Sequence, residues 1–304
     1  MTITFDASVT INKLEIASKE IISKFPELEL SVLPPIAVAA EKIKIEIDRQ
    51  LEQSHPVGRI ISAGMEEQII HLKAYEKLDE PRAAIVHARK ISEIQVTLAY
   101  LVMHTEKFEE FEWRWENFNN LQILRSELLS GSGVSPDGNE WFLSIKSEFL
   151  NVFSGEFQGD FATDAKAWKK YNNWLWPISL KTMYLDSGRV EDYQTDAYHW
   201  GSQHTHFSPM VKLLHSLSDA NITFSSAFKL GIWRDILDCF TVAKNLVTNK
   251  TQLENSHQSW ISYYNMWVVK LMGPVVWERF VRQNSQLMET LAEVGKTPEP
   301  IIYN

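Results

Sequence analysis

Apolar and polar positions alternate along most of the chain with the three- and four-residue steps of amphipathic helices. Residues 36–51 show this pattern, and residues 81–104 continue it from Pro81, which suits the first turn of a helix. The same pattern predicts helices over residues 107–129, 141–153, 165–176, 178–185, 210–217, 225–247 and 256–294, the last of them bent at Gly273-Pro274. No run of strictly alternating residues is flanked by hairpin turns. The sequence therefore predicts an all-α, multi-helix bundle with little or no β-sheet.

The strongest break in the helical pattern is GSGVSPDGNE at residues 131–140. Its length is typical of a loop rather than of a flexible linker, and no repeat with a period of 20–50 residues is visible along the chain. Neither half has a complete set of helices, so we expect a single α-helical domain over residues 1–304. The alternative is a subdivision into residues 1–130 and 140–304, joined by loop 131–139.

Composition narrows the class of protein. The 304 residues are 44% hydrophobic and 23% charged, as in ordinary globular domains. The net charge of −9 argues against a protein that coats nucleic acid through bulk charge, although a local basic groove is compatible with it. Cys239 is the only cysteine, which excludes an intramolecular disulfide, and its apolar neighbours predict a core position. The 11 tryptophans predict a large aromatic core, with or without an interface.

The sequence shows no recognisable secretory signal and no membrane-spanning segment. The first residues have neither the basic region nor the apolar region of a secretory signal. The most apolar stretch, residues 260–277, is interrupted by Asn265, Lys270 and Gly273-Pro274, and is too short and too polar for a membrane span. We therefore expect a cytoplasmic protein with no membrane partner.

Two segments concentrate polar residues that could carry chemistry. In the first, Arg89 and Glu93 lie four residues apart on a helix, so they share a face and can form an ion pair in apolar surroundings. In the second, Tyr198, Ser202 and His206 follow each other at four-residue steps, which would align them on one helical stripe.

Together these segments resemble a bacterial helical family of unknown function, domain of unknown function 5677. Its pattern is an apolar helix with Arg and, four residues later, Glu, followed much later by a Tyr-x3-Ser-x3-His-x-Ser run. The matching residues here are Arg89, Glu93, Tyr198, Ser202, His206 and Ser208. The resemblance spans roughly residues 80–215 and departs from the family at Phe207, where a proline is usual. It implies an all-helical fold with a shared polar cluster, and no established reaction.

An Arg and a His are the minimal set for cleaving a phosphodiester without metal, because His can move the proton and Arg can neutralise the phosphate. Helical nucleases of the HEPN class use an Arg-x4–6-His motif, and residues 82–87 contain one literal match, Arg82 to His87. About one such match is expected by chance in a chain of this length, so the main site is placed on the other segments.

The favoured hypothesis is a HEPN-like bacterial effector, such as a toxin or anti-phage component, that cleaves RNA without a metal or another cofactor. Its catalytic residues would be Arg89 as phosphate clamp, Glu93 as orienting group, and Tyr198, Ser202 and His206.

Two alternatives remain open. One is a non-catalytic helical interaction or regulatory module, in which the polar cluster is structural and Trp-rich faces such as Trp113-x-Trp115 bind a protein partner or a second copy. The other is a metal-dependent hydrolase that uses His204 and His206, with further ligands from the helical pair Glu67-x3-His71. The acidic run at residues 106–116 is expected to be a solvated helix face.

Overall fold

The computed structural model describes residues 7–29, 36–51, 55–78, 81–130, 174–175, 178–189 and 221–272, together with residues 140, 144 and 147. Its α-helices are α1 (Ala7–Lys24), α2 (Ile36–Asp48), α3 (Pro56–Lys77), α4 (Pro81–Met103), α5 (Phe108–Ser130), α8 (Leu180–Asp186), α12 (Asn221–Ala243) and α13 (Lys250–Met272). Within these residues the only β-type contact is an isolated antiparallel bridge between Leu51 and Val247. The prediction of an all-α fold is confirmed.

The chain forms two compact units, which are described separately. The first unit contains residues 1–98 and 190–304, and the second contains residues 99–189. The boundary therefore falls inside α4 and after α8. Loop 131–139, where the sequence suggested a subdivision, lies outside the described residues, and the single domain stays a prediction.

Local sequence signals explain where several helices begin. Pro56 and Pro81 are the first residues of α3 and α4, where a missing amide proton costs nothing. Ser179 caps α8, because its Oγ accepts a hydrogen bond from the amide of Thr182 at 3.1 Å. Asn249 caps α13 in the same way, accepting from the amide of Gln252 at 3.0 Å. Helices α1 and α3 are additions to the set that periodicity predicted.

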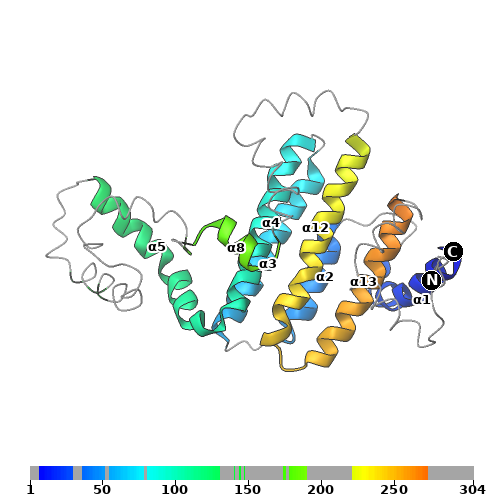
Figure 1. Cartoon of the computed structure of the whole chain (residues 1–304), viewed down its shortest axis with the longest axis horizontal. Coiled ribbons are helices and arrows are strands. Elements are labelled where there is room, and N and C mark those ends of the chain that lie inside the picture. The colour runs from blue at the N-terminus through cyan, green and yellow to red at the C-terminus, as the bar shows by residue number, and fades with distance from the viewer. Residues whose placement is uncertain are drawn as a thin grey trace. The chain divides into compact units, whose positions relative to one another are not determined.

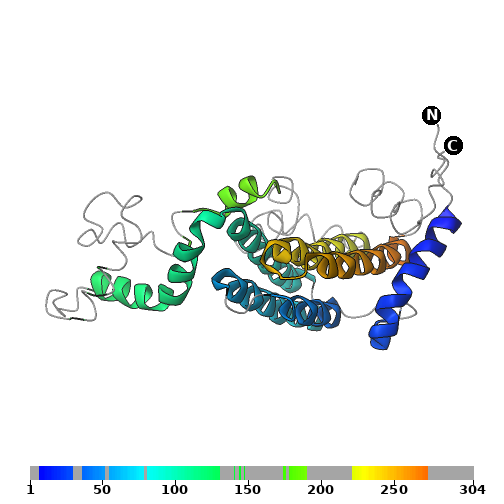
Figure 2. The ribbon, with the colours of Figure 1, turned by 90° about the horizontal axis from the view of Figure 1, so that it is seen from below.

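In the first unit, α12 lies between α4 and α13, and α2 and α3 lie on one side of this layer (Figures 1 and 2). Helix α1 crosses α13 near one end of the group. The fully buried aliphatic side chains of α2 and α3, such as Ile43, Ile47 and Ile61, face the core. Burial of each such side chain stabilises the fold by roughly 1.5–3 kcal/mol.

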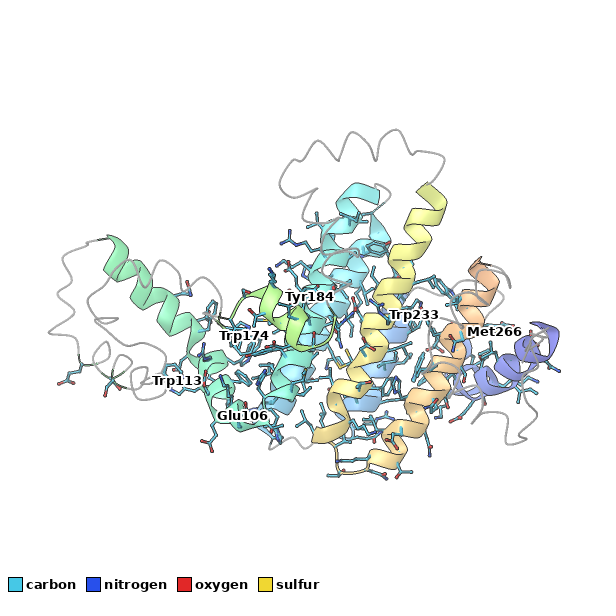
Figure 3. All side chains as sticks on the ribbon, viewed as in Figure 1. Glu106, Trp113, Trp174, Tyr184, Trp233 and Met266 are labelled. Atoms are coloured by element: carbon cyan, nitrogen blue, oxygen red, sulfur yellow. The ribbon has the colours of Figure 1, made fainter. Side chains whose placement is uncertain are left out.

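Aromatic rings fill the space between α12 and α13. Trp233 of α12 is fully buried there (Figure 3), and its ring lies 6.0–6.3 Å from those of Tyr263, Tyr264 and Trp267. Tyr263 also ties α13 to the segment after α1, because its hydroxyl donates to the Leu28 carbonyl at 3.1 Å. The tryptophans of this region therefore form the aromatic core that composition predicted.

Helices α3 and α4 lie in close contact at Gly64. A Cβ atom there would lie 2.8 Å from Cδ2 of Leu98, nearer than real contacts allow. One turn further along α3, the buried Gln68 donates to the side-chain oxygen of Gln95 at 3.2 Å and to the Ile91 carbonyl at 3.3 Å. Cys239 of α12 donates its thiol hydrogen towards both glutamine oxygens, at 3.4 and 3.2 Å. A polar network thus joins three helices inside the core.

In the second unit, the aromatic ring of Tyr100 lies 4.3 Å from that of His104 and 6.2 Å from that of Phe111. Arg114 of α5 is fully buried and pairs with Glu110 at 2.5 Å. The run 106–116 is therefore amphipathic rather than wholly solvated, because Phe111 and Arg114 face inward while Glu106 and Glu116 are exposed. The expectation of a solvated face holds for only part of it.

We predict opposite effects of adding side chains at two helical glycines. Gly64→Val should lower the free energy of unfolding by about 1–3 kcal/mol, because the added atoms must displace Leu98. Gly231→Ala should raise it by about 0.5–1 kcal/mol, because its Cβ meets no described atom within 4 Å and alanine favours the helix. Urea unfolding of both variants measures this, and equal stabilities would contradict the close α3–α4 contact.

A second prediction concerns His257 of α13, whose ring stacks on Phe240 at 5.1 Å. Burial, assisted by Lys244, lowers the pKa of His257 from 6.5 to about 4. The unfolded chain therefore binds the extra proton between these values, so stability present above pH 6.5 is lost as the pH falls towards 4. Between pH 7 and 5 the wild type should lose about 2 kcal/mol more than His257→Phe, as measured by urea unfolding. Identical pH dependence of the two proteins would show that His257 is not the group responsible.

Candidate functional site: a polar cluster on α3 and α4

The ion pair expected between Arg89 and Glu93 is present on α4. Nε of Arg89 lies 2.7 Å from Oε1 of Glu93, and their side chains are only 16% and 9% exposed. Lys90 reaches the other carboxylate oxygen, with Nζ 2.7 Å from Oε2. Both oxygens of Glu93 therefore accept a charge-assisted hydrogen bond.

These contacts explain how a buried carboxylate is tolerated here. Removing a carboxylate from water costs several kcal/mol unless cations and hydrogen bonds replace the lost hydration. Arg89 and Lys90 together supply that replacement. In return, Glu93 fixes the position of the Arg89 guanidinium, which is what a phosphate-binding arginine needs.

The other predicted site residues, Tyr198, Ser202 and His206, lie outside the described residues. The same holds for His204, the candidate metal ligand. Their approach to Arg89 stays a prediction.

Two histidines, His71 and His87, form a contact that the sequence pattern does not predict. Nδ1 of His71 on α3 lies 2.9 Å from Nδ1 of His87 on α4. Oε1 of Glu67, one turn before His71, lies 3.5 Å from its Nε2. The spacing Glu67-x3-His71 predicts the second contact, but the first joins two helices and depends on their register.

The cluster holds His71 in its neutral form. Burial lowers the pKa of the imidazole below 6.5, and His87 and Lys90 lower it further. Glu67 and Glu93 oppose these effects without reversing them. Lys90 and Glu93 are therefore near enough to His71 for their charges to affect its pKa.

The geometry of α4 bears on the literal Arg82-x4-His87 match. Residues 82 and 87 both belong to α4, and residues five apart on an α-helix are separated by about 140° around its axis. His87 pairs with His71, so α3 supplies the histidine's partner.

Other candidate centres behave as packing elements. Cys239 is fully buried, as predicted for a core cysteine. Among the described residues, no group of three or more His, Cys, Asp or Glu side chains is arranged to hold a metal ion. Glu67 and His71 lie one turn apart on α3, and Oε1 of Glu67 is 3.5 Å from Nε2 of His71.

Trp115 is exposed among the described residues of the second unit. Its side chain on α5 is 42% exposed, and its ring lies edge-on to that of Trp174 at 5.2 Å. This position is compatible with the core plus interface that the tryptophan content left open.

No family model, curated protein or solved structure matches the chain. In the part of the chain that the structure describes, none of the helices combines the length and the apolar character needed to cross a membrane.

We predict that Glu93→Gln lowers the free energy of unfolding by about 2–4 kcal/mol, because it leaves Arg89 and Lys90 without their buried anion. The double variant Arg89→Met/Glu93→Leu should be less destabilised than Glu93→Gln, since it removes both buried charges. Urea unfolding measures both, with Glu66→Gln on the exposed side of α3 as a control expected within about 0.5 kcal/mol of wild type. A Glu93→Gln protein as stable as the control would mean that the Arg89–Glu93 ion pair does not contribute to the free energy of unfolding.

Proposed function

We propose that this protein is a HEPN-like bacterial effector of the cytoplasm that cleaves RNA without a metal ion. The single observation that carries the proposal is the guanidinium of Arg89, which the carboxylate of Glu93 holds in place on α4 at 2.7 Å. Positioned cations and imidazoles are the groups that metal-free phosphodiester cleavage requires. A role as a toxin or an anti-phage component would follow from this activity.

In this reaction the 2′-hydroxyl of the RNA attacks the adjacent phosphorus. A histidine takes the hydroxyl proton as the O2′–P bond forms, and an acid returns a proton to O5′ as the P–O5′ bond breaks. Arg89 neutralises the charge that develops on the non-bridging oxygens. His206 acts as base or acid, while Ser202 and Tyr198 hold the substrate by hydrogen bonds.

The acidic net charge limits how RNA can bind. A protein with a net charge of −9 attracts no polyanion from a distance, so recognition must come from local contacts at the site. Lys90 is suited to the first contact, because its side chain is 53% exposed while it remains bonded to Glu93.

A second candidate is a non-catalytic interaction module. The full pairing of the Glu93 carboxylate favours it, because a closed ion pair also serves to fix helix packing. In that case the exposed Trp115 beside Trp174 would contact a protein partner or another copy of the chain.

The test is cleavage of RNA by the purified full chain in EDTA. We expect products ending in a 2′,3′-cyclic phosphate, and no cleavage of DNA or of RNA methylated at the 2′-oxygen. Arg89→Gln should lower kcat/KM by about 10²–10³-fold, and His206→Ala by about 10²–10⁴-fold.

The control for Arg89→Gln is Arg49→Gln, at an exposed position after α2, which should cleave as the wild type does. Circular dichroism and urea unfolding confirm that each variant is folded. Absence of cleavage by the wild type, or equal cleavage by all variants, would refute the nuclease. Loss of stability in Arg89→Gln without any wild-type cleavage would support the interaction module.

A further inference from the structure

The exposed side of α5 in the second unit combines a tryptophan with a line of carboxylates. Trp115 is 42% exposed, and Glu109 and Glu116 on the same helix are also exposed. The half-buried Glu112 lies between these two glutamates at steps of three and four residues, so the three side chains form one line along the helix. Glu112 also lies three residues before Trp115, and helical side chains lean towards the N-terminus, so the indole extends towards the turn of Glu112.

Within residues 108–119 of α5, the exposed charged side chains are all acidic. Arg114 is the only basic residue of this range, and it is fully buried against Glu110. The helix dipole explains acidic residues in the first turn, such as Glu109, but Glu116 lies in the third turn, beyond the reach of that effect. The helix therefore places no cation of its own on this side, and an incoming positive charge meets carboxylates there.

Trp174 supports the ring of Trp115 without covering it. The two ring centroids lie 5.2 Å apart and the ring planes meet at 77°, which is an edge-to-face arrangement. Such a pair uses one face of one ring and the edge of the other, so Trp174 leaves at least one face of Trp115 uncovered. Because Trp115 is also 42% exposed, part of its ring is available to a partner. Tryptophan is the aromatic side chain that best binds a cation over its face.

The charge of this surface decides between the possible occupants. Carboxylates repel both RNA and the anionic surface of a membrane. A second copy of the chain carries the same net charge of −9, and a symmetric dimer through this surface would bring two acidic faces together. A basic segment gains from both features of the surface. Arginine gains more than lysine, because its planar guanidinium stacks on an indole and donates two hydrogen bonds to a carboxylate.

We propose that Trp115 and the carboxylate line of Glu109, Glu112 and Glu116 bind an arginine-rich segment of a partner protein. One arginine of that segment stacks on Trp115 and donates to the neighbouring Glu112, while further arginines pair along the line. The proposal rests on the second candidate function, the interaction module, and gives its partner a defined chemistry. It does not require RNA cleavage, because α5 belongs to the second unit and Arg89 to the first.

The test is peptide binding to the purified full chain, measured by fluorescence anisotropy. Three fluorescein-labelled peptides share one alanine-based sequence, in which the charged residue is arginine, lysine or glutamate. We expect the arginine peptide to bind, the lysine peptide to bind about 3- to 10-fold more weakly, and the glutamate peptide not to bind. Raising the NaCl concentration from about 0.05 M to about 0.5 M should weaken binding, because salt screens exposed charges.

Variants locate the binding surface. Trp115→Ala should raise the Kd of the arginine peptide about 10-fold or more, and Trp115→Phe should raise it less, because phenylalanine keeps a smaller ring. Glu109→Gln/Glu116→Gln should raise this Kd about 3- to 10-fold. The matched control Glu15→Gln/Glu66→Gln removes the same total charge from exposed positions of the first unit and should bind as the wild type does. Circular dichroism and urea unfolding confirm that each variant is folded.

Three results would overturn the proposal: an arginine peptide that binds no better than the glutamate peptide, an unchanged Kd in Trp115→Ala, or equal weakening by the control variant. Sedimentation of the protein alone tests the second copy as occupant. Dimerisation that Trp115→Ala abolishes would refute the arginine-rich partner and keep the interaction module. RNA binding that Trp115→Ala abolishes would refute it in favour of RNA. The expected pattern of peptide affinities supports the proposal whether or not the wild type cleaves RNA.

Discussion

The antiparallel register of α3 and α4 is the constraint on which the candidate site depends. Three contacts follow one another along the pair: Gly64 with Leu98, Gln68 with Gln95, and His71 with His87. As the residue number rises on α3 it falls on α4, so each contact fixes the next. The glycine lets the helices approach, the glutamines favour this register because a slip would break their buried hydrogen bond, and the histidines meet as a result.

The neutral and the charged polar groups of α3 and α4 lie at different depths in the protein. Gln68, Gln95 and Cys239 lie deep in the core, where hydrogen bonds between amides and a thiol avoid the desolvation cost of a charge. Arg89 and Glu93 lie where their side chains keep some exposure, and there a carboxylate can be held by two cations. The uncharged network therefore joins α3, α4 and α12 inside the core, while the charged group holds the Arg89 guanidinium nearer the surface.

Periodicity predicted the helices that carry regular amphipathic faces, and α4 begins at the predicted Pro81. It also predicted the Arg89–Glu93 pair, because contacts four residues apart follow from helix geometry alone. The His71–His87 contact could not be predicted in this way. It joins residues on two helices, and its existence depends on how closely Gly64 lets those helices approach, which no local pattern encodes. The boundary between the two units inside α4 is hidden for the same reason, since the helical pattern continues across it.

The charges of the cluster explain how an acidic protein could bind an anion here. Arg89 and Lys90 contribute +2 and Glu67 and Glu93 contribute −2, so the charges of these four side chains cancel. His71 adds no charge at pH 7, because burial lowers its pKa below 6.5. A phosphodiester bound here would raise the pKa of His71 by its own negative charge, so binding of an anion and uptake of a proton would be linked at this site.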